Sequence, residues 1–281
     1  MRPEDRQAAD WREAAAYAPL LAADRSILAW EWLRRDPGYR AAADRALGQE
    51  TQAAQDSRTD AGEWGLHAFE PAEIAAPAAR PVWRSGFHPY VLEADALPTG
   101  DARNAFELAR VAGMSTIVVE SGQEHLLVSD GLRAVRLDLL SGSVRRGPVR
   151  LHYRLAGLAS AERPLLTLRR LLALWRAGRF SAQLHPVEAR AARFVLMLRA
   201  HDALAAGATQ REIAAVLLSG EAGEARWRVR APTVRSQVQR LVRSARFMAA
   251  GGYLALLGGE DPLAGLGGVP EAIPAVDKTN R

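Results

Sequence analysis

The chain has 281 residues, 48% of them hydrophobic, which is enough for substantial cores in two or three domains. It contains no cysteine, which excludes disulfides, thiolate metal sites and a cysteine nucleophile. The N-terminus is polar, and no apolar run approaches the ~20 residues that cross a bilayer. We therefore expect a cytoplasmic protein with no membrane partner.

The net charge of +5 is unevenly distributed along the chain. Residues 181–257 carry eleven arginines against five acidic residues, whereas residues 1–180 are nearly neutral. The positive field thus belongs to one C-terminal region, and it favours a polyanionic or acidic partner there.

The first forty residues predict helices with aromatic anchors. Asp24 is a suitable N-cap for the second helix, and Asp36-Pro37-Gly38 predicts its end. Five of the seven tryptophans precede residue 84, which is typical of an aromatic core. We expect residues 1–90 to form a helical domain.

Residues 91–160 predict a small antiparallel sheet. Short β-branched or alternating runs occur at 116–120, 125–129, 133–139 and 149–155, and Asp130-Gly131 marks a tight turn. We predict a four-stranded meander with one buried face and one basic, solvent-exposed face that includes Arg136 and Asp138.

Helical periodicity returns in residues 161–257. One helix is predicted from Pro164 to a C-cap at Gly178, and a largely apolar, central helix from His185-Pro186 to Gly207. Thr209-Gln210-Arg211-Glu212 matches a capping box and predicts the start of a short helix. The Gly/Pro-rich tail, residues 258–281, is expected to be disordered.

The segment from Ala225 to Met248 contains seven arginines and no acidic residue. A helix is predicted to start near Pro232 and to end at Gly251-Gly252. Apolar residues form its inner stripe, and Arg235, Gln239, Arg243 and Arg246 form an outer row with Ser236 and Arg240 alongside.

A central helix, a short capped helix and a basic helix in this order resemble a helix-turn-helix. About eleven residues, 221–231, separate the last two helices instead of the usual three or four. Because this insert contains Arg226-Trp227-Arg228, it can be a short helix, a backbone-contacting loop or a tryptophan anchor.

Two sets of residues resemble known proteobacterial domains. The run 207–214, Trp227, the run 234–241 and Gly251-Gly252-Tyr253 with Leu256-Leu257 resemble a C-terminal DNA-binding domain of activators of type VI secretion genes and of conjugative-element excision and transfer. Asp10-Trp11-Arg12, Tyr17 and the run 29–40 resemble the transcriptional-regulator-like domain that often accompanies it. The resemblance implies transcription regulation. Gln210 departs from the small or basic residue expected there, so fine specificity is not implied.

We therefore predict an α+β transcriptional activator that binds promoter double-stranded DNA through a recognition helix at about 232–249 and needs no cofactor. The candidate DNA-contacting residues are Gln210, Arg211, Arg226, Arg228, Arg230, Thr233, Arg235, Ser236, Gln239, Arg240, Arg243 and Arg246. A homo-oligomer is expected because many helix-turn-helix proteins read paired half-sites. The N-terminal domain is a candidate for assembly or for contacting RNA polymerase or an antiactivator.

Two other functions compete with this prediction. The basic helix could instead dock acidic proteins, as in an antiactivator that does not bind DNA. An enzyme is the third alternative, although the six scattered histidines, at 67, 88, 125, 152, 185 and 201, form no metal motif and no phosphate-binding loop or nucleophile elbow occurs.

Overall fold

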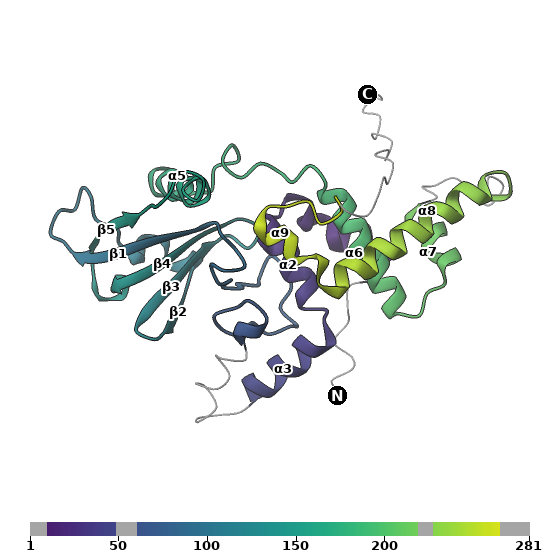
Figure 1. Cartoon of the computed structure of the whole chain (residues 1–281), viewed down its shortest axis with the longest axis horizontal. Coiled ribbons are helices and arrows are strands. Elements are labelled where there is room, and N and C mark those ends of the chain that lie inside the picture. Colours follow the sequence, from purple (N-terminus) through teal and green to yellow (C-terminus); the bar gives the residue numbers. More distant parts are fainter. Residues whose placement is uncertain (1–9, 49–60, 219–226, 265–281) are drawn as a thin grey trace.

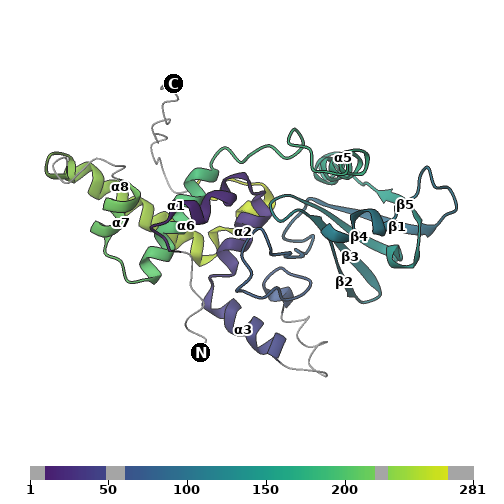
Figure 2. The same cartoon turned by 180° about the vertical axis from the view of Figure 1, so that it is seen from behind.

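A computed structural model describes residues 10–48, 61–218 and 227–264; for residues 227–233 it describes the backbone alone. A sheet covered by one helix forms one end of the molecule, and most of the other helices gather at the opposite end (Figures 1 and 2). The helical elements are α1 (Ala14–Tyr17), η2 (Ala18–Ala22), α2 (Arg25–Leu33), α3 (Pro37–Gly48), η3 (Leu108–Met114), η4 (Val144–Arg146), α5 (Glu162–Ala177), α6 (Ala191–Ala205), α7 (Gln210–Leu217), α8 (Trp227–Phe247), η6 (Met248–Gly252) and α9 (Leu254–Gly258). The strands are β1 (Val91–Pro98), β2 (Ser115–Glu120), β3 (Gln123–Ser129), β4 (Ala134–Gly142) and β5 (Val149–Arg154). The fold is α+β, as the sequence predicts.

The sheet is mixed and five-stranded, in the order β2-β3-β4-β1-β5, so the predicted four-stranded antiparallel meander is wrong. β2, β3 and β4 do form an antiparallel meander. β1 then pairs in parallel with β4, and β5 pairs with β1 instead of β4. β1 was not predicted from the sequence, because its centre, Glu93-Ala94-Asp95-Ala96, has no β-branched residue.

Both faces of the central strands are covered. α5 packs on one face, where Leu171 and Leu174 join Leu126 and Leu137 in an apolar cluster. On the other face Arg136 is only 2% exposed, and its Nε donates to the carbonyl of Trp83 at 3.2 Å. The prediction that Arg136 and Asp138 face solvent is therefore wrong, because residues from the stretch 61–90, among them His67 and Trp83, cover them.

The N-terminal and C-terminal helices share one hydrophobic core. Trp30 and Leu33 of α2 belong to the same cluster as Phe194 and Met197 of α6 and Leu241 of α8. The predicted division of the chain into three domains, 1–90, 91–160 and 161–257, followed by a tail, stays a prediction. Within this arrangement α5 packs on the sheet, α6 and α9 pack with the N-terminal helices, and α7 and α8 pack on α6.

A buried polar network joins α2 to α6. Arg35 donates from Nε and Nη2 to the two carboxylate oxygens of Asp202, at 2.7 and 2.8 Å. Tyr17 donates its hydroxyl to the same carboxylate at 2.6 Å, and Arg35 also pairs with Glu31 at 2.6 Å. These charges are almost fully removed from solvent, so each depends on its partner.

Several predicted helix boundaries are confirmed and two are not. α5 ends at Gly178 in the left-handed conformation, as predicted. α6 starts at Ala191 and not at His185-Pro186, because His185 turns to Asp24 at 3.1 Å and Glu188 pairs with Arg25 at 2.5 Å.

The second shifted boundary is that of α8, which is already helical at Trp227, five residues before the predicted start at Pro232. Pro232, the sixth residue of α8, has no N–H to donate to the carbonyl four residues earlier, so the helix continues through it with one hydrogen bond fewer. Residues 219–226, which hold the first part of the predicted insert, and residues 265–281, which hold most of the predicted disordered tail, lie outside the described residues.

Candidate nucleic-acid interface

α7 starts with the predicted capping box. The Thr209 hydroxyl accepts from the Glu212 N–H at 3.3 Å, and the Glu212 carboxylate accepts from the Thr209 N–H at 2.8 Å. The hydrogen bonds from the Thr209 N–H and hydroxyl lower the pKa of Glu212 below its ordinary value. The capping box therefore fixes the start of α7, and it engages the carboxylate of Glu212 in hydrogen bonds to Thr209.

Packing on α6 and α8 sets the orientation of α7. Ile213 and Ala214 are completely buried, while Gln210 and Arg211 are exposed in the first turn. The exposed N-terminus of α7 thus presents an arginine, a glutamine and backbone N–H groups, which are groups that bind anionic oxygens.

α8 is held by the inner stripe that the sequence predicts. Val238, Leu241, Val242 and Ala245 are buried, and α8 packs along α6. At 1.5 Å per residue, the helix is roughly 30 Å long. Both views show α8 and α7 extending from the helical end, away from the sheet (Figures 1 and 2).

The opposite side of α8 carries the predicted polar row. Arg235, Gln239, Arg243 and Arg246 are exposed, and Ser236 is exposed beside them. Positions 235, 239, 243 and 246 follow helical spacing, so these side chains line one face. Because the inner stripe is buried, it determines the direction in which this row points.

Arg240 is placed differently from the rest of the row. It is half-buried, and its Nε is enclosed without a hydrogen-bond partner among the described residues. Only part of its guanidinium can reach a partner from solvent, which separates Arg240 from Arg235 and Arg243.

The arginines of this surface are not neutralised within the part of the chain that the structure describes. Arg235, Arg240, Arg243 and Arg246 form none of the ion pairs found there. The only acidic residue of α7 is Glu212, which the capping box engages. The exposed arginines of α8 can therefore meet an external anion, whereas Glu212 keeps a negative charge at the start of α7.

Four candidate residues lie where their side chains cannot be placed. Arg226 is outside the described residues. Arg228, Arg230 and Thr233 belong to the first turns of α8, where only the backbone is described. Their roles stay predictions.

The fold also brings a cation from the N-terminal segment to α7. Arg199 of α6 donates to the carbonyls of Trp11 and Arg12, at 2.9 and 3.0 Å. The exposed Arg12 is then near enough to Glu212 to help lower the pKa of that carboxyl, after the hydrogen bonds from Thr209. Sequence reasoning missed Arg12 because about 200 residues separate it from α7.

Comparison with protein families gives two matches. Residues 10–67 match a proteobacterial transcriptional regulator-like domain, and residues 156–258 match the DNA-binding domain of a T6SS transcription factor family. The second match contains α7, α8 and their exposed polar row. Comparisons with curated proteins and with solved structures gave no match.

No helix in the described ranges combines the length and the apolar composition needed to cross a bilayer.

Proposed function

Because this chain carries a proteobacterial transcriptional regulator-like domain together with a T6SS transcription-factor DNA-binding domain, we propose that it is a promoter-binding transcriptional activator in which α8 enters the major groove. α7 then crosses the backbone beside the groove. Catalysis and cofactors form no part of this function, and promoter binding implies action in the cytoplasm.

One observation carries the proposal: the exposed row Arg235, Gln239, Arg243 and Arg246 lies on a helix whose buried stripe fixes its orientation. Arginine forks onto guanine O6 and N7, and glutamine pairs with adenine N6 and N7. Arg235, Gln239 and Arg243, with the partly accessible Arg240, are therefore the proposed base-reading residues, and Ser236 and Arg246 flank them.

Phosphate contacts are assigned to the surrounding cations and donors. Gln210 and Arg211 stand at the N-terminus of α7, where helix geometry favours an anion. Arg12, which pairs with Asp10 at 3.8 Å, lies close enough to Glu212 of the same helix to lower its pKa. We assign Arg226, Arg228, Arg230 and Thr233 to the same backbone role, since they precede the row on the chain.

Measured DNA affinity tests the proposal. Fluorescence anisotropy would compare a promoter fragment with a scrambled duplex, for wild type and Arg243→Ala. A base contact by Arg243 predicts a loss of ~1–3 kcal/mol on the promoter and little change on the scrambled duplex. Arg40→Ala, an exposed arginine on α3, is the matched control and should bind both duplexes as wild type does.

The result that overturns the proposal is wild-type protein that binds neither duplex at low salt. If the same protein captured an acidic protein through Arg243, α8 would be a protein-docking helix, as in an antiactivator. Salt dependence alone does not separate these functions, because both interactions are electrostatic.

The proposed active form is a homo-oligomer, because paired half-sites require paired recognition helices. The N-terminal helices are the proposed contact for RNA polymerase or an antiactivator, since α8 is assigned to DNA.

A promoter-reporter assay tests activation: deleting the gene should lower reporter expression, and higher expression would indicate a repressor. Sedimentation of the free and DNA-bound protein measures the number of subunits, and a monomer in both states would contradict the oligomer.

A further inference from the structure

β2 is an edge strand of the sheet, and its outer side is open. Its inner side pairs with β3 in a regular antiparallel register. All its residues are half-buried, and no backbone hydrogen bond from outside the sheet reaches Ile117 or Val119 in the part of the chain that the structure describes. The open edge of a sheet is a template on which another strand can pair.

The turn between β2 and β3 determines which backbone groups of β2 point outward. Ser121 and Gly122 form this two-residue turn, with φ of +51° and +80°, which is the pattern of a type I′ turn. The residues that flank such a turn, Glu120 and Gln123, form a hydrogen-bonded pair, and bonded pairs alternate along an antiparallel ladder. Every second residue of β2, counted back from Val119, therefore directs its N–H and C=O away from β3.

Ile117 and Val119 are the residues that can bond a further strand. Their N–H and C=O groups point outward and make no backbone hydrogen bond on that side within the described ranges. Ser115 points the same way, but its N–H donates to the carbonyl of Ala112. An antiparallel partner strand would therefore pair with Ile117 and Val119.

β2 lacks the features that protect the edge strands of natural sheets. Its sequence, Ser-Thr-Ile-Val-Val-Glu, is mostly β-branched, and it contains no lysine, proline or bulge. The opposite edge strand, β5, alternates the basic residues Arg150, His152 and Arg154 with apolar ones. A two-fold antiparallel pairing of β5 with itself would set these basic side chains against each other, which is unfavourable. Self-association through the sheet is therefore favoured at β2.

From this geometry we propose that β2 pairs antiparallel with β2 of a second copy of this chain, around a two-fold axis that passes beside Val118. In this register Ile117 lies opposite the partner's Val119, and each such pair exchanges two hydrogen bonds through the free backbone groups. The two sheets then form one continuous sheet. This inference rests on the homo-oligomer of the proposed function and names its interface.

The side chains also match across this axis. On one face Val118 meets the partner's Val118, and Glu120 lies opposite the partner's Thr116, whose hydroxyl can donate to the carboxylate. On the other face the β-branched side chains of Ile117 and Val119 meet. No like charges are opposed, because Glu120 is the only charged residue of β2.

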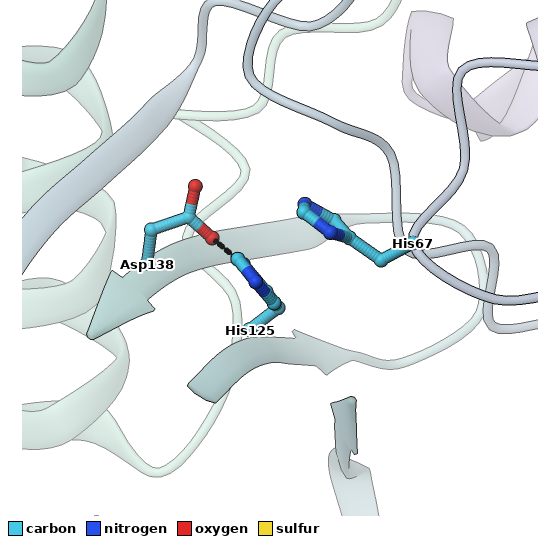
Figure 3. Close-up of side chains that lie close together, drawn as sticks. All are labelled: His67, His125 and Asp138. Carbon is cyan, nitrogen blue, oxygen red and sulfur yellow. Dashed lines mark hydrogen bonds and ion pairs between the residues drawn. The ribbon is translucent and has the colours of Figure 1, made fainter. Parts of the chain in front are cut away.

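Neighbouring side chains hold Glu120 in place at the edge. The His67 Nδ1 lies 2.7 Å from its carboxylate, and Arg84 donates to it at 2.6 Å. His67 is itself held, because its ring stacks on that of His125 with centroids 3.5 Å apart, and His125 pairs with Asp138 (Figure 3). The side chain of Glu120 is still 22% exposed, so it can accept a hydrogen bond from a second copy.

Pairing through β2 leaves the candidate nucleic-acid interface free. The sheet forms one end of the molecule, and α7 and α8 extend away from it at the other end (Figures 1 and 2). Joining two copies through their sheets therefore places α7 and α8 of both copies on the outside of the dimer, where DNA can reach them.

Disulfide cross-linking tests the interface directly, because the chain has no cysteine of its own. Val118 and the partner's Val118 would form a non-hydrogen-bonded pair with Cα atoms about 4.5 Å apart, a distance that a disulfide can span. Mild oxidation of full-length Val118→Cys without DNA should therefore give a covalent dimer on a non-reducing gel. His152→Cys, at an exposed position on the other edge strand, is the matched control and should stay largely monomeric on that gel.

Two substitutions of Thr116 test the register through charge. Thr116→Glu sets carboxylates opposite each other at both ends of the paired strands, and it should raise the dissociation constant of the assembly by roughly 2–30-fold. Thr116→Lys offers Glu120 an opposite charge and should leave this constant unchanged or lower it. Sedimentation of the free full-length protein measures both variants, and circular dichroism checks that they fold. Wild type should contain an even number of subunits, because the interface is two-fold.

The proposal is wrong if wild type is a monomer at every concentration, if Val118→Cys cross-links no faster than His152→Cys, or if the two folded Thr116 variants assemble alike. A monomer whose Ile117 amide resists hydrogen exchange would show that another segment of the same chain covers β2. Arg243→Ala should assemble as wild type does, so a failure of DNA binding and a failure of this interface are separate results.

Discussion

Arg35, in the turn after α2, and Asp202 of α6 form a two-bond ion pair, with Nε to Oδ1 at 2.7 Å and Nη2 to Oδ2 at 2.8 Å. Arg35 also reaches Glu31, where burial alone would raise the carboxyl pKa but the charges of Arg35 and Arg34 keep it low. One guanidinium thus holds two nearly buried carboxylates across the junction of the two family-matched regions.

Replacing Arg35 should strongly destabilise the fold. Arg35→Ala leaves two buried carboxylates short of their partner and is expected to lower the free energy of unfolding by about 3–5 kcal/mol. Chemical denaturation followed by tryptophan fluorescence measures the change. Arg40→Ala, on the exposed side of α3, is the control and should change the free energy of unfolding by less than about 0.5 kcal/mol. A similar small shift for Arg35→Ala would mean that the ion pair contributes little.

Substitution of two glycines with left-handed backbone tests how closely β4 approaches β1. At Gly142, φ is +79° and an added Cβ would lie 1.8 Å from the carbonyl oxygen of Ala96. At Gly122, φ is +80° but no atom lies within 4 Å of the added Cβ. Gly122→Ala should cost ~1–2 kcal/mol, the backbone penalty alone, and Gly142→Ala should cost clearly more. Thermal unfolding compares them, and equal losses would contradict the close approach of β4 to β1.

Acid should weaken the fold through His88. Burial lowers the pKa of His88 to about 4, although the Leu257 carbonyl opposes this, whereas an unfolded histidine has a pKa of about 6.5. Between pH 4 and pH 6.5, His88 therefore binds a proton in the unfolded chain but not in the folded chain. The contribution of His88 to stability is therefore complete above pH 6.5 and declines as the pH falls to 4.

His88→Gln should flatten the pH dependence of unfolding between pH 6.5 and 4. His152→Gln, at an exposed position on β5, is the control and should leave the curve of wild type unchanged. Denaturant melts at half-unit pH steps measure both. An unaltered slope in His88→Gln would show that other groups cause the acid sensitivity.

Salt dependence should separate the two kinds of DNA contact. Arg211→Ala removes a proposed phosphate contact, so it should weaken binding to promoter and scrambled duplexes alike and reduce the salt slope by about one. Gln239→Ala removes a proposed base contact and should act mainly on the promoter, with little change in slope. Anisotropy titrations at several salt concentrations measure both, and the reverse pattern would exchange the two assignments.

Local patterns in the sequence were sufficient to predict the capping box of α7 and the buried stripe of α8. The Thr209–Glu212 box and the spacing of Val238, Leu241 and Val242 depend on neighbours within one or two turns, so periodicity reveals them. The half-burial of Arg240 and the approach of Arg12 to α7 depend on packing between distant segments, which periodicity does not contain.

The burial of Arg136 and Asp138 in the sheet was not predicted for the same reason, since it depends on a distant segment. Arg136 and Asp138 alternate with apolar residues, a pattern typical of a solvent-exposed face. The segment that buries them lies more than fifty residues earlier, and it also brings His67 to His125. A cluster assembled from three distant stretches leaves no motif along the chain.

The shared core of α2, α6 and α8 limits how this protein can be divided. A fragment starting at residue 156 would contain the entire matched DNA-binding region, yet it would leave the surface of α6 that packs against α2, where His201 contacts Trp32, open to water. We expect such a fragment to aggregate alone and to be rescued when the N-terminal helices are supplied as a separate chain. That rescue would show that the matched DNA-binding region needs helices from the other end of the sequence to complete its core.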